Sequence, residues 1–236
     1  MNNLDTAPHV LSDIYVDVTF DELRKKIKTS TQSSALLKNA EKALLKTKGM
    51  WQPKAVYKWL KVSDPDRTTP WCAIQTQDSC EKINLGYSKR FFKDAELALE
   101  SIYTIGDALE LESVNASKRG DHLEAYFFDI IGLIALDKTC QAVIKIAEAS
   151  ARKRGWGVSP FLSPGSIHGW GLEEQKKLAS LLPIDEIDVR IREDAVLSPF
   201  KTISCMIGLG PTFTQHQVGT TCQVCSKNKD CTMRQI

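Results

Sequence analysis

Three cysteines lie close together late in the sequence, in the pattern Cys222-x2-Cys225-x5-Cys231. A CxxC pair places two thiols on one turn, and Cys231 can fold back to supply a third ligand. Thiolates suit soft metal sites, so the spacing predicts either zinc or an iron–sulfur cluster. The pattern lacks the spacing of a bacterial ferredoxin and the second CxxC of a zinc ribbon. The sequence does not identify a fourth ligand: it could be Cys205, His216 or a residue of a partner chain, or one iron could keep an open position. The alternative to a metal site is three unligated thiols.

Two serine–proline segments are the other candidates for binding chemistry. They are Ser163-Pro164-Gly165 and Ser198-Pro199. In each, proline fixes one backbone angle and serine offers a hydroxyl beside a turned backbone. Gly165 would let the polar end of a ligand approach main-chain N–H groups closely. From local sequence alone, two simple connectors are the favoured interpretation, because such turns are common.

No catalytic arrangement stands out elsewhere in the chain. His168 lies in a loop rich in proline, glycine and serine, and no cysteine or carboxylate is placed to complete a triad with it. No pair of carboxylates has a spacing that indicates acid–base catalysis. Local motifs therefore do not identify an active site.

Composition indicates an ordinary globular protein, with 42% hydrophobic and 25% charged residues. The 31 basic and 29 acidic residues leave a net charge of +2, which gives no argument for nucleic acid or an anionic membrane surface. The N-terminus carries no secretory signal, and the most apolar stretch, 127–136, is too short to span a bilayer and contains Asp129. We therefore expect a cytoplasmic protein with reduced thiols, in which a cysteine cluster indicates metal or redox chemistry before disulfides.

Hydrophobic periodicity predicts a chain of mixed helices and strands. Thr19 and Glu22 form a capping-box pattern for a helix that runs to about residue 28. Further helices are predicted at 33–48, 53–60, 92–103, 121–154 and 172–182. Strands are predicted at 11–20, at two places within 71–87, at 187–192 and at 202–209. The elements alternate without a regular βαβ rhythm, so the predicted class is α+β.

The order of several segments resembles one known family. The segments are Thr104-Ile105-Gly106-Asp107-Ala108-Leu109-Glu110, Asp129-Ile130-Ile131-Gly132, Ser163-Pro164-Gly165, Trp170-x-Leu172-Glu173-Glu174-Gln175, Leu197-Ser198-Pro199-Phe200-Lys201-Thr202-Ile203-Ser204 and Ile207-Gly208-Leu209-Gly210. Over roughly residues 80–210 they resemble the activation (reactivation) domain of cobalamin-dependent methionine synthase, in its stand-alone form. The tail pattern of Cys222, Cys225, Cys231 and Arg234 is also similar to tails of stand-alone members.

The resemblance implies a fold and a role. Members of the family are α+β proteins with a twisted antiparallel sheet flanked by helices. They bind S-adenosylmethionine in an extended groove and cap a corrinoid that a partner domain holds. After accidental oxidation of the cobalt, an electron and a methyl group from S-adenosylmethionine restore methylcobalamin.

The resemblance also assigns residues. Ser163, Pro164 and Gly165 fall on the family's ligand-binding loop, where backbone groups meet S-adenosylmethionine. The family's arginine before this tripeptide and tyrosine after it are absent, because the chain has Phe161-Leu162 before it and Ser166 after it. The lost arginine would have paired with the ligand carboxylate. The segment from Leu197 to Ser204, with Ser198, Pro199 and Lys201, corresponds to the part that approaches the corrinoid.

Together these features predict an accessory protein that docks on a corrinoid (vitamin B12)-dependent methyltransferase and supports its reductive reactivation. Cys222, Cys225 and Cys231 are predicted to hold a 4Fe-4S cluster that relays electrons, with an electron donor protein and homodimer formation as further possibilities. The alternative is a non-catalytic module that binds a corrinoid protein and uses its cysteines for structural zinc; a metal-dependent enzyme of unrelated substrate is a third. The predicted organisation is an N-terminal extension at 1–75, an activation-domain-like core at 76–212 and a cysteine-bearing tail at 213–236.

Overall fold

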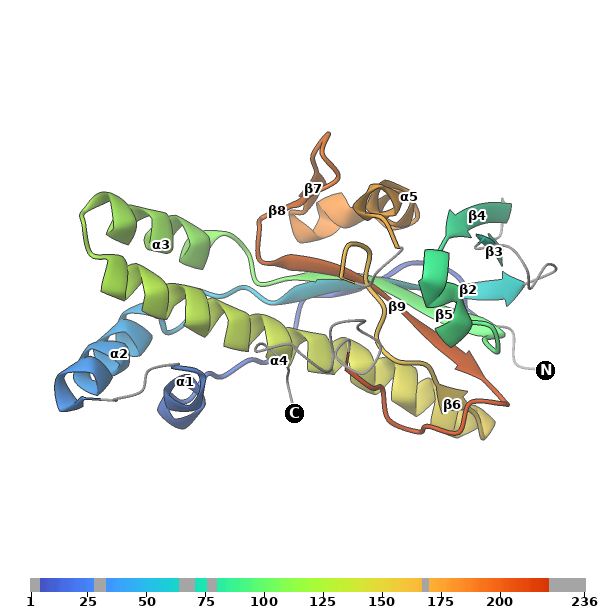
Figure 1. Ribbon diagram of the computed structural model, residues 1–236, viewed down its shortest axis with the longest axis horizontal. Coiled ribbons are helices and arrows are strands. Elements are labelled where there is room, and N and C mark those ends of the chain that lie inside the picture. The colour runs from blue at the N-terminus through green and yellow to red at the C-terminus, as the bar shows by residue number, and fades with distance from the viewer. Residues whose placement is uncertain (1–4, 28–32, 64–70, 76–79, 167–169, 221–236) are drawn as a thin grey trace.

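The computed structural model describes residues 5–27, 33–63, 71–75, 80–166 and 170–220. A central antiparallel sheet separates two layers: the long helix α4 (His122–Arg154) lies across one face, and the short helix α5 (Gln175–Ser180) lies against the other (Figure 1). The predicted class, α+β with an antiparallel sheet flanked by helices, is confirmed. None of the helices in these residues is long and apolar enough to cross a membrane.

The main sheet has the strand order β4-β3-β2-β5-β9-β6, and β1 pairs with β2 beside this path. Each neighbouring pair is antiparallel. The strands are β1 (His9–Leu11), β2 (Lys54–Ser63), β3 (Trp71–Gln75), β4 (Cys80–Asn84), β5 (Leu97–Thr104), β6 (Gly157–Val158) and β9 (Thr202–Gly210). A separate hairpin pairs β7 (Arg190–Ile191) with β8 (Leu197–Ser198). β2 and β5 lie at the centre of this order, and β9, which pairs with β5, leads to the candidate site.

The helices begin and end where the sequence supplies caps. They are α1 (Phe20–Lys26), α2 (Ser34–Thr47), α3 (Ala108–Lys118), α4 (His122–Arg154) and α5 (Gln175–Ser180), with short 3-10 turns η1 (Gly86–Phe91), η2 (Leu172–Glu174) and η3 (Ile184–Ile187). The predicted capping box of α1 is confirmed, because the Thr19 hydroxyl accepts from the Glu22 amide and the Glu22 carboxylate accepts from the Thr19 amide. Asp121 caps the start of α4, and Gly155, with φ +68°, ends it in the left-handed conformation.

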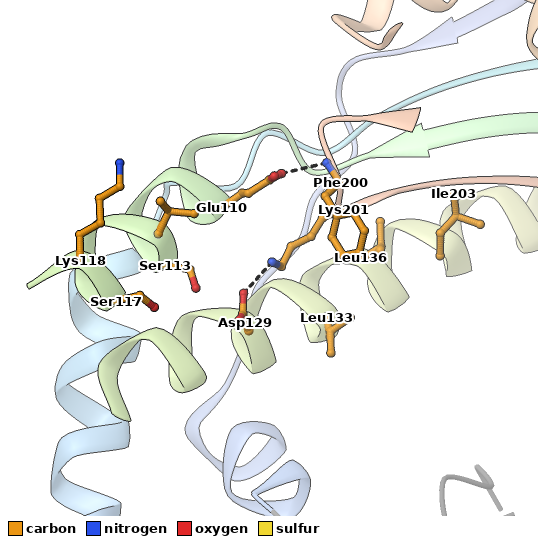
Figure 2. Close-up of a pocket in the computed structure, with 11 residues that line it drawn as sticks. Glu110, Ser113, Ser117, Lys118, Asp129, Leu133, Leu136, Phe200, Lys201 and Ile203 are labelled. Atoms are coloured by element: carbon orange, nitrogen blue, oxygen red, sulfur yellow. Dashed lines mark hydrogen bonds and ion pairs between the residues drawn. The ribbon is translucent and has the colours of Figure 1, made fainter. Parts of the chain in front are cut away.

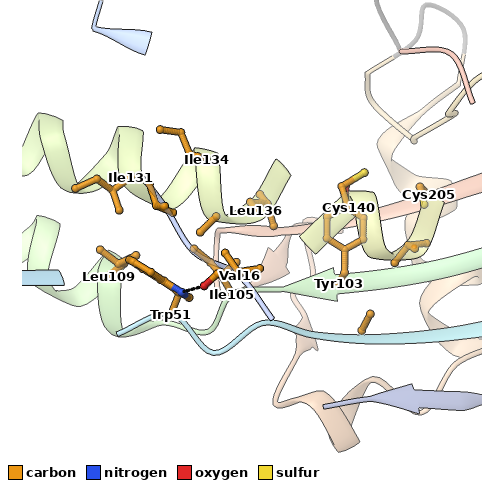
Figure 3. Close-up of a cluster of buried hydrophobic side chains, with 14 of the residues drawn as sticks. Val16, Trp51, Tyr103, Ile105, Leu109, Ile131, Ile134, Leu136, Cys140 and Cys205 are labelled. Atoms are coloured by element: carbon orange, nitrogen blue, oxygen red, sulfur yellow. Dashed lines mark hydrogen bonds between the residues drawn. The ribbon is translucent and has the colours of Figure 1, made fainter. Parts of the chain in front are cut away.

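Side chains of β5 alternate between the two layers. Leu97, Leu99 and Tyr103 pack in the larger hydrophobic cluster beneath α4, while Ala98 and Ile102 join clusters on the α5 side. Figure 3 shows part of the larger cluster, in which the indole N–H of Trp51 donates to the carbonyl of Val16 at 2.9 Å. The sheet is therefore buried on both faces at its centre.

Three predicted elements are wrong. The segment at 11–20 is mostly irregular after β1: Val16 and Val18 are buried as the alternation suggested, but the Val16 carbonyl pairs with Trp51 rather than with a strand. The helix predicted at 53–60 is strand β2, whose Val56 and Trp59 favour extended backbone. The helix predicted at 92–103 is mostly strand β5. A strand buried on both faces lacks period-two alternation, so its apolar run fitted a helical stripe.

The remaining predictions are closer. The helices at 33–48, 121–154 and 172–182, the strands within 71–87 and the strand at 202–209 are confirmed, while the strand at 187–192 shrinks to the two residues of β7. The region up to residue 75 supplies β1, β2 and β3, and β2 lies between β3 and β5 in the same sheet. This region therefore contributes to the body of the sheet.

Candidate functional site

Strand β9 connects the features that the sequence singled out. The Ser198–Lys201 turn leads into its start, and the hydroxyl of Ser163 donates to the carbonyl of Ser204 at 2.8 Å near its middle. Leu162 forms an isolated antiparallel bridge with Met206, so the Ser163-Pro164-Gly165 segment lies along this edge of the sheet. The structure thus places the two serine–proline segments beside one strand, β9, with Ser198-Pro199 ahead of its start and Ser163-Pro164-Gly165 near its middle.

The turn before β9 is held against α3 and α4 by polar contacts. The ammonium of Lys201 lies 2.9 Å from Asp129 Oδ1, and the amide of Phe200 donates to Glu110 Oε2 at 2.8 Å (Figure 2). The stem of Lys201 is buried and passes over Gly132, where a Cβ would lie 2.4 Å from Lys201 Cε. The Lys201 carbonyl accepts from the hydroxyl of Thr104 at 3.3 Å. Four contacts from three elements therefore fix the shape of this turn.

A groove of about 890 Å³ opens beside this turn, between α3 and α4 (Figure 2). Its lining is mainly apolar, and Phe200 and Leu133 are 72% and 60% exposed. The full lining is Glu110, Ser113, Val114, Ser117, Lys118, Asp129, Leu133, Leu136, Phe200, Lys201 and Ile203. A concave, mostly apolar site with a few polar groups is the usual form of a binding site, so this groove is the candidate functional site.

A second hollow of about 470 Å³ lies on the other side of the same turn. Its lining is Asp107, Glu110, Leu111, Asp185, Asp188, Val189, Arg190, Ser198 and Pro199, and Glu110 belongs to both hollows. Four carboxylates against one guanidinium make this hollow acidic. Asp188 pairs with Lys54 at 2.6 Å, and the hydrogen bond from that ammonium lowers the pKa of the carboxyl. Of the predicted corrinoid-facing residues, Lys201 lines the first hollow, and Ser198 and Pro199 line the second.

The Ser163-Pro164-Gly165 segment lies outside the lining of both hollows. Ser163 is buried, and the amide of Gly165, with φ +74°, donates to the carbonyl of Trp170 at 3.0 Å. The neighbouring amides of Phe161 and Leu162 donate to Gly219 and Met206. These amides already have backbone partners, so a ligand that needs them must compete. Ligand binding at this loop stays a prediction, and His168 lies outside the described residues.

The chain after β9 returns along this loop. The amide of Val158 donates to the carbonyl of Gln215 at 2.8 Å, that of Phe161 to Gly219 at 2.9 Å, and that of Val218 to the Glu148 carboxylate at 2.8 Å. The start of the tail is thereby fixed beside the predicted ligand loop.

Cys222, Cys225 and Cys231 themselves lie outside the described residues. Within the part of the chain that the structure describes, no group of three or more His, Cys, Asp or Glu side chains could hold a metal ion. Of the two suggested fourth ligands, Cys205 is fully buried beneath α4, and burial raises the pKa of its thiol well above the ordinary value. His216 is exposed on the returning segment, which makes it the more accessible of the two.

Glu100 is a buried carboxyl that sequence reasoning missed. It lies on β5 opposite Lys58 and Met206, and neither of its side-chain oxygens has a hydrogen-bond partner among the described residues. Burial raises its pKa well above the ordinary value, against a smaller lowering by the charge of Lys58. The apolar run around it hid this residue, because the segment was interpreted as helix.

The groove residues of α3 and α4 were also missed as a site. Glu110, Asp129 and Gly132 belong to segments that carried the family resemblance, but no role was assigned to them. That these residues contact the same turn becomes visible only in the structure, where Phe200 and Lys201 reach both helices. The signal in the sequence was the order of the motifs, which does not itself define a groove.

The element order, with a seven-stranded antiparallel sheet crossed by the long helix α4, defines the class of this protein as an α+β fold. A crystal structure of the MetH reactivation domain bound to AdoHcy shares this fold with a TM-score of 0.56, 11% sequence identity, and coverage of 90% of this chain and 81% of that chain. The resemblance inferred from the sequence is thus confirmed at the level of the fold. No family model matches the sequence. A search of curated proteins likewise returns no match.

Proposed function

We propose that this chain is an accessory protein that docks on a corrinoid-dependent methyltransferase and supports the reductive reactivation of its corrinoid. The observation that carries the proposal is the fold shared with the MetH reactivation domain over 90% of the chain. The rigid turn at Phe200 and Lys201 adds to it, because this is the segment that the family resemblance places toward the corrinoid. The partner is a protein that carries a corrinoid.

In this role the chain's own residues supply surface and orientation. The contacts of Lys201 with Asp129 and of Phe200 with Glu110 hold the turn in one shape before any partner arrives. A preformed surface loses little conformational entropy on binding, so more of the contact energy appears as affinity. The cobalt chemistry belongs to the corrinoid, and this chain orients the partner that holds it.

Cys222, Cys225 and Cys231 are the proposed ligands of a 4Fe-4S cluster, with structural zinc as the alternative. A cluster would supply one-electron transfer when bound, whereas zinc would only stabilise the tail. The start of the tail is fixed by Val218 and Gly219, upstream of all three cysteines. Metal analysis and absorption spectroscopy of anaerobically purified protein separate the two: iron with sulfide supports the cluster, and one zinc per chain without iron would end the electron-relay idea.

Binding of S-adenosylmethionine is a separate part of the proposal. The MetH reactivation domain was crystallised with AdoHcy. In this chain, Phe161 and Leu162 stand before the tripeptide, and their amides are already paired with Gly219 and Met206. This observation favours the second candidate, a module that binds a corrinoid protein without catalysis. Calorimetric titration with AdoHcy and with S-adenosylmethionine decides between them: saturable binding supports the reactivation role, and its absence at millimolar ligand supports the module.

The test of docking uses the purified full chain and a purified cobalamin-binding domain of a corrinoid methyltransferase. We expect saturable binding in biolayer interferometry that Phe200→Asp weakens at least tenfold, because Phe200 is the most exposed apolar side chain of the groove. Leu123→Asp is the control, since Leu123 is another exposed apolar residue, on α4, and lies outside the groove lining. Equal effects of the two variants would contradict docking at this turn.

A further inference from the structure

We propose that the groove between α3 and α4, together with the acidic hollow beside it, forms one docking surface for an amphipathic helix of the partner that carries basic residues at one end. The proposal names the kind of partner surface that the proposed docking uses, and it therefore rests on that function. The spacing, exposure and charge of the lining residues support this surface.

The walls of the groove have helical spacing. On α3 the lining includes Glu110, Ser113 and Ser117, which are separated by three and four residues; on α4, Asp129, Leu133 and Leu136 are separated by four and three. Two such stripes flank a channel that accepts the side chains of a third helix. The lining runs from residue 110 to residue 118 on α3, about 12 Å at 1.5 Å per residue. A two-turn helical segment fits this length.

The floor and rim of the groove are apolar and open. Phe200, Leu133 and Val114 are 72%, 60% and 45% exposed, and buried Leu136 completes the α4 side. Leu111, one residue from the shared Glu110, extends this apolar surface toward the second hollow. Clustered exposed apolar side chains of this kind mark interaction sites on soluble proteins. They favour a partner that presents an apolar stripe.

Charge decides which end of the partner helix lies over the second hollow. Asp107, Asp185 and Glu110 line this hollow with Asp188, whose charge Lys54 already balances, and Arg190 is the single cation of the lining. The surplus of carboxylates favours lysine or arginine side chains, which also suit the C-terminal end of a helix because of its dipole. Complementary charge of this type sets orientation and speeds association.

The test uses two synthetic helical peptides of 14 residues with the same leucine stripe. One carries two lysines at its C-terminal end, and the other carries two glutamates there. We expect the lysine peptide to bind the full chain at least tenfold more tightly by fluorescence anisotropy at low salt. Leu133→Asp should abolish this binding, and Leu123→Asp should retain it; circular dichroism confirms that both variants fold. Asp185→Asn together with Asp107→Asn should reduce the preference for the lysine peptide.

Any of four results in the peptide assay would overturn the proposal: no saturable binding of the lysine peptide, equal affinity for the two peptides, equal effects of Leu133→Asp and Leu123→Asp, or binding that requires removal of residues 221–236. The last result would identify the chain's own tail as the occupant. Self-association of the chain that Leu133→Asp abolishes would identify a second copy instead, and it would overturn the proposal too. The assay needs no corrinoid, so its failure is distinguishable from failure to bind a cobalamin-binding domain.

Discussion

Lys201 reaches from the turn before β9 across α4 to Asp129, with 2.9 Å between Nζ and Oδ1. The stem of Lys201 is buried, whereas the carboxylate of Asp129 is 54% exposed at the groove. An exposed carboxylate adds little net electrostatic energy to such a pair. The main consequence of the contact is therefore geometric: it fixes the turn, and with it the floor of the groove.

Gly132→Ala tests this geometry. The added Cβ would lie 2.4 Å from Lys201 Cε and 2.6 Å from Cδ, so the stem of Lys201 must move. Overpacking of this kind costs about 1–3 kcal/mol, and the better helix propensity of alanine returns about 1 kcal/mol. We expect a net loss of about 1 kcal/mol in the free energy of unfolding, measured by urea titration, and weaker binding of the lysine peptide.

The control for this prediction is a double-mutant cycle with Lys201→Ala, which removes the atoms that the new Cβ would meet. In that background Gly132→Ala should be neutral or slightly stabilising. The same loss with and without the lysine side chain would show that the stem does not fill the space above Gly132.

The buried carboxyl of Glu100 should make the stability of the protein depend on pH. Burial raises its folded-state pKa above the ordinary value of 4.5. Above pH 4.5 the folded state therefore keeps a proton that the unfolded chain releases. The contribution of the protonated Glu100 to the free energy of unfolding is complete below the unfolded pKa. It is lost as the pH rises from about 4.5 through the raised pKa, by at most about 1.4 kcal/mol per pH unit. Urea titrations between pH 5 and pH 9 should show this fall.

Glu100→Gln keeps the shape of the neutral acid and removes the ionisation. We expect the fall in stability to flatten, so that the variant is more stable than the parent at the alkaline end. Glu96→Gln, at an exposed position before the same strand, should leave the slope unchanged. Parallel pH profiles for the parent and Glu100→Gln would show that this carboxyl is not the group responsible.

The sequence was most informative where the structural signal is local. The capping box at Thr19, the long stripe of α4 and its end at Gly155 all depend on neighbouring residues alone. The strand Leu97–Thr104 was not recognised because every residue in it is buried, including the polar Glu100 and Ser101, so its polar residues do not mark an exposed face. The spacing of its apolar residues could not separate a strand from a helix.

The candidate site was predictable only in part. Lys201 was named through a family resemblance, but its partners Asp129 and Gly132 lie some 70 residues away in the sequence, and no local pattern joins them. Glu110 reaches the same turn from α3. Such contacts depend on how α3, α4 and β9 pack, which is a property of the whole sheet. The order of motifs identified the fold, and the groove required its geometry.

Gln175 links three elements on the α5 side of the sheet. Its side-chain carbonyl accepts from the hydroxyl of Ser204 at 2.8 Å, and its amide donates to the carbonyl of Ala195 at 2.6 Å. Gln175→Ala would leave two buried polar groups unpaired, at a cost of about 2–3 kcal/mol in the free energy of unfolding. Lys176→Ala, on the exposed side of the same helix, is the control. A loss no larger than that of the control would show that water replaces the lost contacts.

A comparison of Gly165→Ala with Gly49→Ala distinguishes backbone strain from steric crowding in the predicted ligand loop. Its φ of +74° is left-handed, and a Cβ there would lie 3.3 Å from Leu172 Cδ1. Gly49 has a similar φ of +82° with no atom within 4 Å of its Cβ position, so Gly49→Ala measures the strain alone. That strain costs about 1–2 kcal/mol for an L-residue. We expect Gly165→Ala to destabilise the chain more than Gly49→Ala in thermal unfolding, because Leu172 must also shift; equal losses would mean that the loop relaxes freely around the new methyl group.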